Sequence, residues 1–287
     1  MSANLLERVP LGTCSWNYDS WIGLAYSRKE PYSAAYLSEY SSRYPTVEVD
    51  SWFYRMPAPQ DAREYRERTP EGFTFACKVS ERISLTHERS RDKSAPLIPN
   101  PDFLSAGAYD EYLRGLAPLK DRVFLAELEF EYLNKQKMSG VDEFMKRLGA
   151  FAEAVERDIP PERRVPLGIE CRNANYLTRE YFRFLKDTGI AHVFSEKMYL
   201  PHVYELAEKF GDLIGDRCAV RLLGGDRKEI EEKTKGEWNR IVEPKEDLPK
   251  IADAIAELAR GSRLVQVYVN NHFEGSAPLT IERLKEA

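Results

Sequence analysis

Cysteine and histidine, on which many metal and redox sites depend, are scarce in this sequence. Only four of each occur among 287 residues, and no two cysteines form a C-x-x-C pair or another metal-ligand spacing. Each cysteine falls within a segment with the pattern of a strand; they are Cys14, Cys77, Cys171 and Cys218. We therefore expect small buried thiols rather than a zinc site or a disulfide framework.

Long apolar runs and an excess of positive charge are also missing. No run approaches the roughly 20 apolar residues of a membrane-spanning helix, and the first residues, MSANLLERVP, lack the basic-then-apolar layout of a secretory signal. The formal net charge is −5, from 42 basic and 47 acidic residues, so no overall basic field attracts a polyanion such as DNA. We expect a cytoplasmic protein with no membrane partner. Nucleic acid is not the favoured ligand, although the net charge does not exclude a local basic patch.

The sequence does contain a regular alternation of strand-like and helix-like segments. Helical spacing is clearest at 141–155 and 251–258. The eight β-rich runs are 10–16, 46–51, 73–79, 123–129, 165–172, 191–196, 218–224 and 264–271. Eight such repeats predict a TIM (β/α)8 barrel, a closed parallel sheet with helices outside, as a single domain over residues 1–287. A doubly wound open sheet is the alternative.

Charged and amide residues occupy one phase of these runs near their carboxyl ends. Alternate residues of a strand face opposite sides, so if Val47 and Val49 pack on the helices, Glu48 and Asp50 face the barrel interior. The same alternation places these residues inside on the later strands: Lys78, Glu127, Glu129, Glu170, Arg172, Glu196, Arg221, Gln266 and Asn270. Because barrel enzymes keep their chemistry at the carboxyl ends of the strands, we expect a functional site there.

This interior set holds six carboxylates against three cations, which are Lys78, Arg172 and Arg221. The structural alternative to a site is a self-neutralising network, with pairs such as Glu48 with Lys78 or Glu170 with Arg172. Unpaired buried carboxylates are costly unless they are protonated, metal-bound or matched by a ligand, so the acidic surplus favours a functional site.

Six ordered segments of the chain resemble the signature segments of a known family. They are GTCSW followed by Tyr18 and Trp21, TVEVDSWFYRMP, TPEGFTFACKVSERISLTH, GIECRN, VRLLGG and VYVNNHFEGSAP. Together they span nearly the whole chain and resemble the YecE-like family, domain of unknown function 72. The resemblance implies a TIM-barrel fold with no established activity, similar in shape to the endonuclease IV and sugar isomerase barrels.

Carried over residue by residue, the resemblance points to nine positions. They are Glu48, Tyr54, Lys78, His87, Glu170, Arg172, Arg221, Asn270 and Asn271. The chain departs from the family pattern in three places. GTCSW replaces G-T-S-G-W, Leu223 replaces the histidine of R-L-H-G, and ELEF, with Glu127 and Glu129, replaces Q-L-P-P. A histidine is lost and acids are added, so histidine-dependent chemistry is not carried over to this chain.

Four of these residues are candidates for catalysis. Glu48 and Glu170 form a candidate acid and base, because two carboxylates whose pKa values are pushed apart run acid-base chemistry near neutral pH; the alternative is that each binds a neighbouring cation. Lys78 is a candidate Schiff-base amine, but an adjacent carboxylate raises the pKa of a lysine, which favours an ion pair or phosphate binding. His87 is a candidate for proton transfer, or else an exposed loop histidine.

The candidate substrate-binding residues are arginines, aromatics and asparagines. They are Tyr18, Trp21, Tyr54, Arg172, Arg221, Asn270 and Asn271. The arginines offer planar forks for carboxylate or phosphate, and the asparagines both donate and accept hydrogen bonds. The aromatic rings are suited to stacking on a sugar or base, with packing of the barrel rim as the alternative.

No metal site is assigned from the sequence. Glu127, Glu129, Glu170 and Glu196 carry the oxygen ligands that Mg²⁺ or Mn²⁺ prefers, but such a cofactor is not favoured. The histidine-rich set of a zinc nuclease is missing from the sequence.

Three hypotheses about function follow from these observations. The leading one is an enzyme, a hydrolase, lyase or isomerase, that uses acid-base or hydrolytic chemistry on a small polar substrate such as a sugar or phosphorylated compound. The second is a nucleic-acid processing protein that resembles endonuclease IV. The third is a non-catalytic module that binds a ligand or partner. The sequence does not indicate an oligomeric state.

Overall fold

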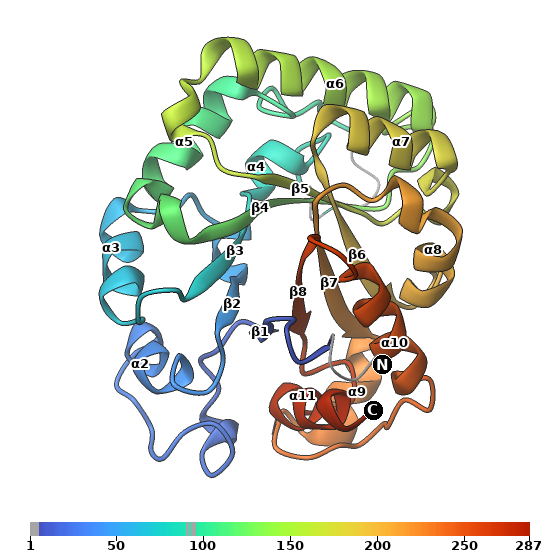
Figure 1. The fold of residues 1–287 in the computed structure, drawn as a ribbon. Helices are drawn as coiled ribbons and strands as arrows, with labels where there is room; N and C mark the ends of the chain where they lie inside the picture. The colour runs from blue at the N-terminus through green and yellow to red at the C-terminus, as the bar shows by residue number, and fades with distance from the viewer. Residues whose placement is uncertain (1–5, 90–91, 93–95) are drawn as a thin grey trace.

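The computed structural model describes residues 6–89, 92 and 96–287, and its sheet is a closed barrel of eight parallel strands in chain order (Figure 1). The strands are β1 Leu11–Cys14, β2 Thr46–Val49, β3 Thr74–Lys78, β4 Val123–Phe130, β5 Leu167–Cys171, β6 Ala191–Lys197, β7 Arg217–Gly224 and β8 Leu264–Val269. The ring closes because Thr13 of β1 pairs with both Val47 of β2 and Val269 of β8. The predicted TIM barrel is confirmed, and the open-sheet alternative is wrong.

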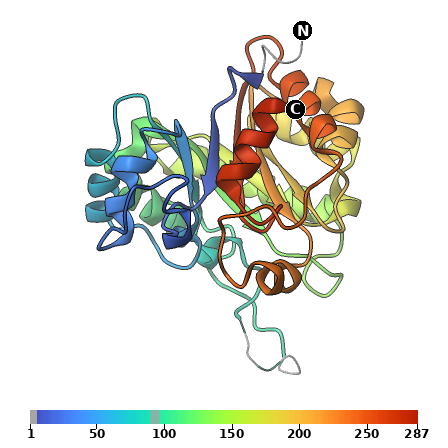
Figure 2. The ribbon, with the colours of Figure 1, turned by 90° about the horizontal axis from the view of Figure 1, so that it is seen from below.

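Helices surround the barrel on the outside (Figures 1 and 2). They are α2 Leu37–Tyr40, α3 Pro59–Glu67, α4 Glu81–Ser84, α5 Ala106–Leu116, α6 Val141–Asp158, α7 Arg179–Thr188, α8 Val203–Phe210, α9 Arg227–Thr234, α10 Leu248–Leu258 and α11 Ala277–Glu286. Contacts run from α3 through α5 and α6 to α7, and from α8 through α10 to α11. No helix in the described part of the chain is long and apolar enough to cross a membrane.

The sequence pattern explains where the helices begin and which face they bury. In α6, Phe144, Leu148 and Phe151 recur at three- to four-residue spacing and are buried against the barrel. The α7 helix begins after Thr178, whose hydroxyl accepts from the backbone N–H of Tyr181, and ends at Gly189, whose φ of 69° suits a residue without Cβ. Such helices return the chain from the carboxyl end of one strand to the amino end of the next.

Two cores result, one between the strands and the helices and one inside the barrel. The inner core is narrow and contains small side chains such as Ala76, Ala191 and Ala219 beside Leu125 and Val193. The four cysteines are all buried and unpaired, as predicted. Because the strands are parallel, every carboxyl end opens at the same face, which we call the mouth.

Candidate functional site

Charged side chains from five strands meet inside the barrel just below the mouth. We call this group the charged cluster; its members are Glu48, Lys78, Glu127, Glu129, Glu170, Arg172 and Arg221. Each occupies the interior phase near the carboxyl end of β2, β3, β4, β5 or β7, or directly after it. The convergence predicted from strand alternation is therefore confirmed for these seven residues.

Arg221 is the central cation of the charged cluster. Its Nε and Nη2 donate to the two oxygens of Glu48 at 2.6 and 2.7 Å, and its Nη1 donates to Oε2 of Glu170 at 2.5 Å. Such a bidentate pair fixes both position and orientation. Burial acts to raise the pKa of Glu48, but the charges of Arg221 and Lys78 and the hydrogen bonds from Arg221 together outweigh burial and lower that pKa. The partner of Glu48 is thus Arg221 rather than the Lys78 expected from the adjacent strand.

Lys78 is the second buried cation and is surrounded by three carboxylates. Its Nζ lies 2.8 Å from Glu170, 3.1 Å from Glu129 and 3.4 Å from Glu127. Burial acts to lower the pKa of the Lys78 amine, but the surrounding carboxylates outweigh burial and raise that pKa. A protonated amine cannot attack a carbonyl, so this environment favours the predicted ion-pair role of Lys78 over the Schiff-base role.

Glu170 joins the two cations and is the most heavily bonded carboxylate of the cluster. Besides Lys78 and Arg221, it accepts from the hydroxyl of Ser195 at 2.9 Å and from Nε of Arg172 at 3.3 Å. Burial acts to raise its pKa, but Arg221 and the other cations hold the pKa well below the ordinary range. The side chain of Glu170 is fully buried, as is that of Glu48, so neither opens directly to solvent.

Glu127 differs from the other members because its carboxyl group accepts no hydrogen bond. Both of its oxygens are buried without a donor among the described residues. Lys78 Nζ lies near it but is not aligned as a hydrogen bond, and burial outweighs this attraction and raises the pKa of Glu127 to about 8. Glu127 is therefore a buried acid that holds its proton near neutral pH.

Glu129 and Arg172 connect the charged cluster to an open pocket at the mouth. Nη2 of Arg172 donates to Glu129 at 2.7 Å, and their side chains are 29% and 14% exposed. They line a cavity of about 550 Å³, which we call the mouth pocket. Its volume lies within the roughly 300–1,000 Å³ that small ligands occupy.

Aromatic and polar side chains form the walls of the mouth pocket. Tyr54 is exposed there with Phe53 beside it, and His87 bonds through Nδ1 to the hydroxyl of Thr86 at 2.9 Å. An ion pair of Lys137 with Glu131 also lines the pocket. The structure thus places Tyr54, His87 and Arg172, three of the candidate residues, around one cavity.

The other predicted binding residues lie on the opposite side of the mouth, where most of them pack the rim. Nε1 of Trp21 donates to Oδ1 of Asn271 at 3.2 Å, and both side chains are buried. Tyr18 packs on Trp21 with ring centroids 4.7 Å apart, and Asn270 accepts from the backbone N–H of His272. None of these four is among the residues that line the mouth pocket.

The expectation that Glu196 faces the barrel interior is wrong. Its carboxylate leaves the lumen, accepts from the backbone N–H of Val203 at 2.9 Å and bonds to the His202 ring at 2.6 Å. The interior position is taken by Ser195, because small residues fit the narrow lumen and bulkier His192 and Phe194 pack outward.

The residues considered as metal ligands do not surround a common site. Glu127, Glu129 and Glu170 are gathered around the Lys78 amine, and Glu196 lies outside the lumen. Among the described residues, Glu196, His202 and Asp247 do come close together. However, Glu196 already bonds to His202 and to the first turn of α8, so the arrangement is accounted for as a cap of that helix.

The sequence pattern did not identify Ser195 and Lys197 as interior residues, because Glu196 of β6 was expected to face the barrel interior. Ser195 donates to Glu170, and Lys197, two residues later, lies at the mouth within the electrostatic reach of Arg172 and Glu170. The small residues at alternate positions of AHVFSEK were the signal that would have identified the interior phase.

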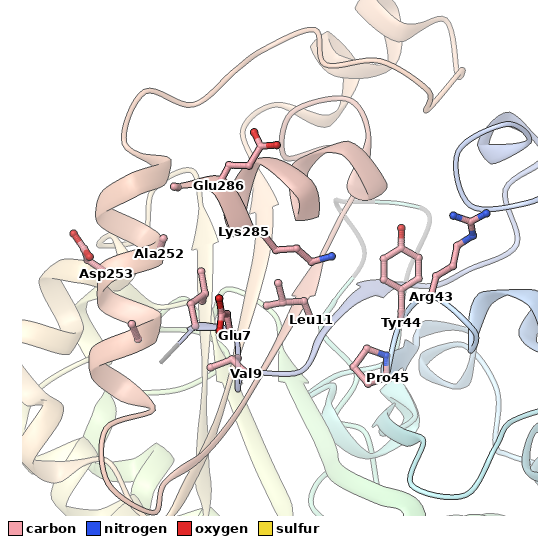
Figure 3. A pocket seen from close by; sticks show the side chains of 13 residues that line it. Glu7, Val9, Leu11, Arg43, Tyr44, Pro45, Ala252, Asp253, Lys285 and Glu286 are labelled. Carbon is pink, nitrogen blue, oxygen red and sulfur yellow. The ribbon is translucent and has the colours of Figure 1, made fainter. Parts of the chain in front are cut away.

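A cavity of similar volume, about 520 Å³, lies at the amino end of the barrel (Figure 3). Leu11, Val9, Tyr44 and Ala252 form its apolar wall, and charged side chains such as Lys285 stand at its edge. Among the described residues that line it, no set of buried charges converges. Because the amino end of a TIM barrel generally serves stability, we assign the site to the mouth.

Comparisons with known proteins agree with the fold. The sequence profile of a family described as "Protein of unknown function DUF72" matches residues 10–287. A DUF72 family protein from Enterococcus faecalis is similar in structure, with a TM-score of 0.68 and 18% identity over 97% of this chain and 96% of that one. Another from Thermotoga maritima has a TM-score of 0.64 and 18% identity, covering 97% and 98% of the two chains. The search of curated proteins found no match.

Proposed function

This chain belongs to the DUF72 family of proteins of unknown function, and from that premise we propose that it is an enzyme acting on a small, polar, negatively charged substrate in the mouth pocket. The chemistry is acid-base or hydrolytic, and phosphorylated sugars are the substrate class that fits best.

The observation that carries the proposal is a buried ionic network that ends at an open cavity. Arg221, Lys78 and Glu170 are buried and hold one another in fixed positions, whereas Arg172 and Glu129 belong to the same network and reach the pocket. A buried ionic network gives little net stability compared with apolar packing, so stability alone does not explain why these charged residues are present. Fixed charges beside a shaped cavity are what electrostatic catalysis requires.

The geometry supports different roles for exposed and buried members. Arg172 is suited to bind the anionic group through its planar fork, and Glu129 to accept a proton from the substrate. His87 stands in the same pocket as the candidate proton donor. Glu48 and Glu170, fully buried, act in this proposal as positioning residues that hold Arg221, Lys78 and Arg172.

The experiment is a turnover screen of phosphorylated sugars, with the matching unphosphorylated sugars as a second set. Wild type is compared with Glu129→Gln, and with Glu143→Gln as a control, because Glu143 pairs with Arg147 on the exposed face of α6. We expect turnover of a phosphorylated compound that Glu129→Gln lowers by about 10²-fold or more while the control leaves it unchanged. Turnover that is equal in wild type and Glu129→Gln contradicts the assignment.

A ligand-binding module without catalysis is the second candidate. The observation that favours it is the complete pairing of Glu48 and Glu170, which leaves neither carboxylate available as a reacting group. Binding of a phosphorylated sugar without any turnover, in wild type and Glu129→Gln alike, would establish this second candidate.

A further inference from the structure

Lys197 occupies a special position at the end of β6. The pairing of β6 with β7 shifts between Glu196 and Lys197, so that Glu196 pairs with Leu222 and Lys197 with Gly224. Gly224 has a φ of +83°, and a Cβ there would lie 2.3 Å from the carbonyl oxygen of His272. Close packing therefore holds the backbone beside Lys197, and this fixes the position of the Lys197 Cβ atom.

The amine of Lys197 is the one interior cation near the mouth that has no bonded partner within the described chain. Lys78, Arg172 and Arg221 each make ion pairs with carboxylates at 2.5–2.8 Å. No hydrogen bond or ion pair involves the Lys197 side chain in residues 6–89, 92 and 96–287, although the residue is only partly exposed. An unpaired, partly buried amine is costly, so its retention points to a ligand.

Lys197 lines the smaller of two cavities at the mouth and is not among the residues that line the mouth pocket. It lines a cavity of about 270 Å³ with Lys245, His202 and Asp247, while the charges that act on it include Arg172 and Glu129 of the mouth pocket. The charged groups that act on it electrostatically include Glu129, Glu170, Arg172, Arg221 and His272, and the titratable groups that share its cavity are Glu196, His202, Lys245 and Asp247. Arg172 and Lys197 line neighbouring cavities at the carboxyl end of the barrel and act on each other electrostatically.

The electrostatic surroundings of Lys197 differ from those of Lys78. Burial and the positive charge of Arg172 lower the pKa of the Lys197 amine, the reverse of what the carboxylates do to Lys78. A lysine becomes a nucleophile when desolvation or a neighbouring cation increases the share of free amine. The Schiff-base role considered for Lys78 thus matches the environment of Lys197 better.

We propose that Lys197 forms a Schiff base with the carbonyl group of a small anionic aldehyde or ketone whose anionic group is bound by Arg172. This inference rests on the proposed function and deepens it by naming the substrate class. The Nζ lone pair attacks the carbonyl carbon, a C–N bond forms, and the oxygen takes a proton to give a carbinolamine. Loss of water then yields the C=N bond, so the step needs no oxidant or reductant, and hydrolysis reverses it.

The test uses pyridoxal 5′-phosphate as an anionic aldehyde probe, followed by borohydride reduction and peptide mass spectrometry. Wild type is compared with Lys197→Arg, which keeps the charge but not the nucleophile, and with Lys245→Arg, a control lysine from the same cavity that pairs with Glu243. We expect one predominant adduct, on Lys197, that Lys197→Arg abolishes and Lys245→Arg leaves unchanged. Labelling spread over exposed lysines, with Lys197 no faster than the rest, overturns the proposal.

A second comparison separates anion recognition from amine reactivity. Arg172→Gln is expected to slow labelling by pyridoxal 5′-phosphate by about tenfold, and to leave labelling by uncharged propionaldehyde almost unchanged. Equal slowing of both probes would contradict the role given to Arg172.

Binding of inorganic phosphate, measured by calorimetry in wild type and Lys197→Arg, distinguishes the two levels of the proposal. If phosphate binds both proteins and Lys197 gives no adduct, the Schiff base is wrong while the proposed anionic-substrate site stands. If phosphate binds neither protein, the proposed function fails as well.

Discussion

Polar side chains fill both ends of the barrel interior, but they are neutral at the amino end and charged at the carboxyl end. At the amino end, neutral side chains bond to one another: the Thr46 hydroxyl and the Tyr268 hydroxyl both donate to Oε1 of Gln266, at 2.9 and 2.5 Å, and Nε2 of Gln266 donates to Thr74 at 3.0 Å. At the carboxyl end, charged side chains form the charged cluster, with Arg221 and Lys78 at its centre.

This difference teaches that the fold does not need charges inside the barrel. The neutral layer satisfies its polar groups and fills the lumen, whereas the charged layer leaves both oxygens of Glu127 without a donor. Burying charges costs free energy that mutual attraction offsets only in part. In the proposed function the charged layer serves the mouth pocket, and each prediction contrasts it with the neutral layer.

The largest effect is expected from Arg221→Met. The substitution leaves Glu48 and Glu170 buried with a main cation removed, which should lower the free energy of unfolding by about 3–5 kcal/mol at pH 7. Urea denaturation measures this change. If Arg221→Met costs no more than a substitution in the neutral layer, the two ends of the lumen are energetically equivalent and the contrast is lost.

The next effect is a dependence of stability on pH that arises from Glu127. Its pKa is raised to about 8 in the folded protein from an ordinary 4.5, so the folded state keeps a proton that the unfolded chain releases. Stability should therefore fall as pH rises through this window, by up to about 1.4 kcal/mol per pH unit. Glu127→Gln should remove that slope in urea denaturation between pH 5 and 8.

The control for this slope is Glu143→Gln, on the exposed face of α6, which should retain the wild-type pH dependence. Glu170 has the opposite sign: its lowered pKa gives stability that is present above pH 4.5 and lost as pH falls below that value. Identical slopes in wild type and Glu127→Gln would show that Glu127 is ionised and paired with Lys78.

A smaller effect concerns ligand binding at the mouth. Arg172→Gln should weaken phosphate or sugar-phosphate binding by about tenfold or more, because a hydrogen bond to a charged group contributes about 1.5–3 kcal/mol. Calorimetry measures the affinity. The matched control is Arg179→Gln, which breaks an exposed ion pair between Arg179 of α7 and Asp212. This variant should bind the ligand as wild type does.

The smallest effect is expected in the neutral layer. Tyr268→Phe removes one hydroxyl that donates to Gln266, and the free energy of unfolding should fall by only about 1 kcal/mol, with no change in ligand affinity. A loss as large as that of Arg221→Met, or a loss of binding, would show that the amino end also serves the site.

The sequence predicts most of the charged layer because strand alternation is a local property. Glu48, Lys78, Glu170 and Arg221 follow from a period of two and from the parallel barrel, without knowledge of distant contacts. Alternation does not say which charges pair, since that depends on the stagger of the strands: Arg221 of β7 reaches across to Glu48 of β2.

The failures have equally specific reasons. In β6 both alternating sets of side chains include apolar residues, so hydrophobicity does not show which set faces the lumen. The charge of Glu196 suggested the wrong set, and Lys197 was missed for the same reason. At the rim, Trp21 and Asn271 lie 250 residues apart in sequence, and no local pattern indicates that they bond to each other. The phase of β6 follows from the fit of Ser195 inside the lumen and the bonds of Glu196 to α8, whereas the Trp21–Asn271 bond follows from packing between distant loops.

The most direct test of the central claim is a crystal structure of the protein soaked with a phosphorylated sugar, because the mouth pocket and the amino-end cavity have similar volumes and lie at opposite ends of the barrel. Figure 3 shows the amino-end cavity. The account predicts the phosphate within hydrogen-bond distance of the Arg172 guanidinium, with the sugar beside Glu129 and Tyr54. Ligand density at the amino-end cavity lined by Leu11 and Tyr44, with the mouth pocket open to solvent, would contradict it.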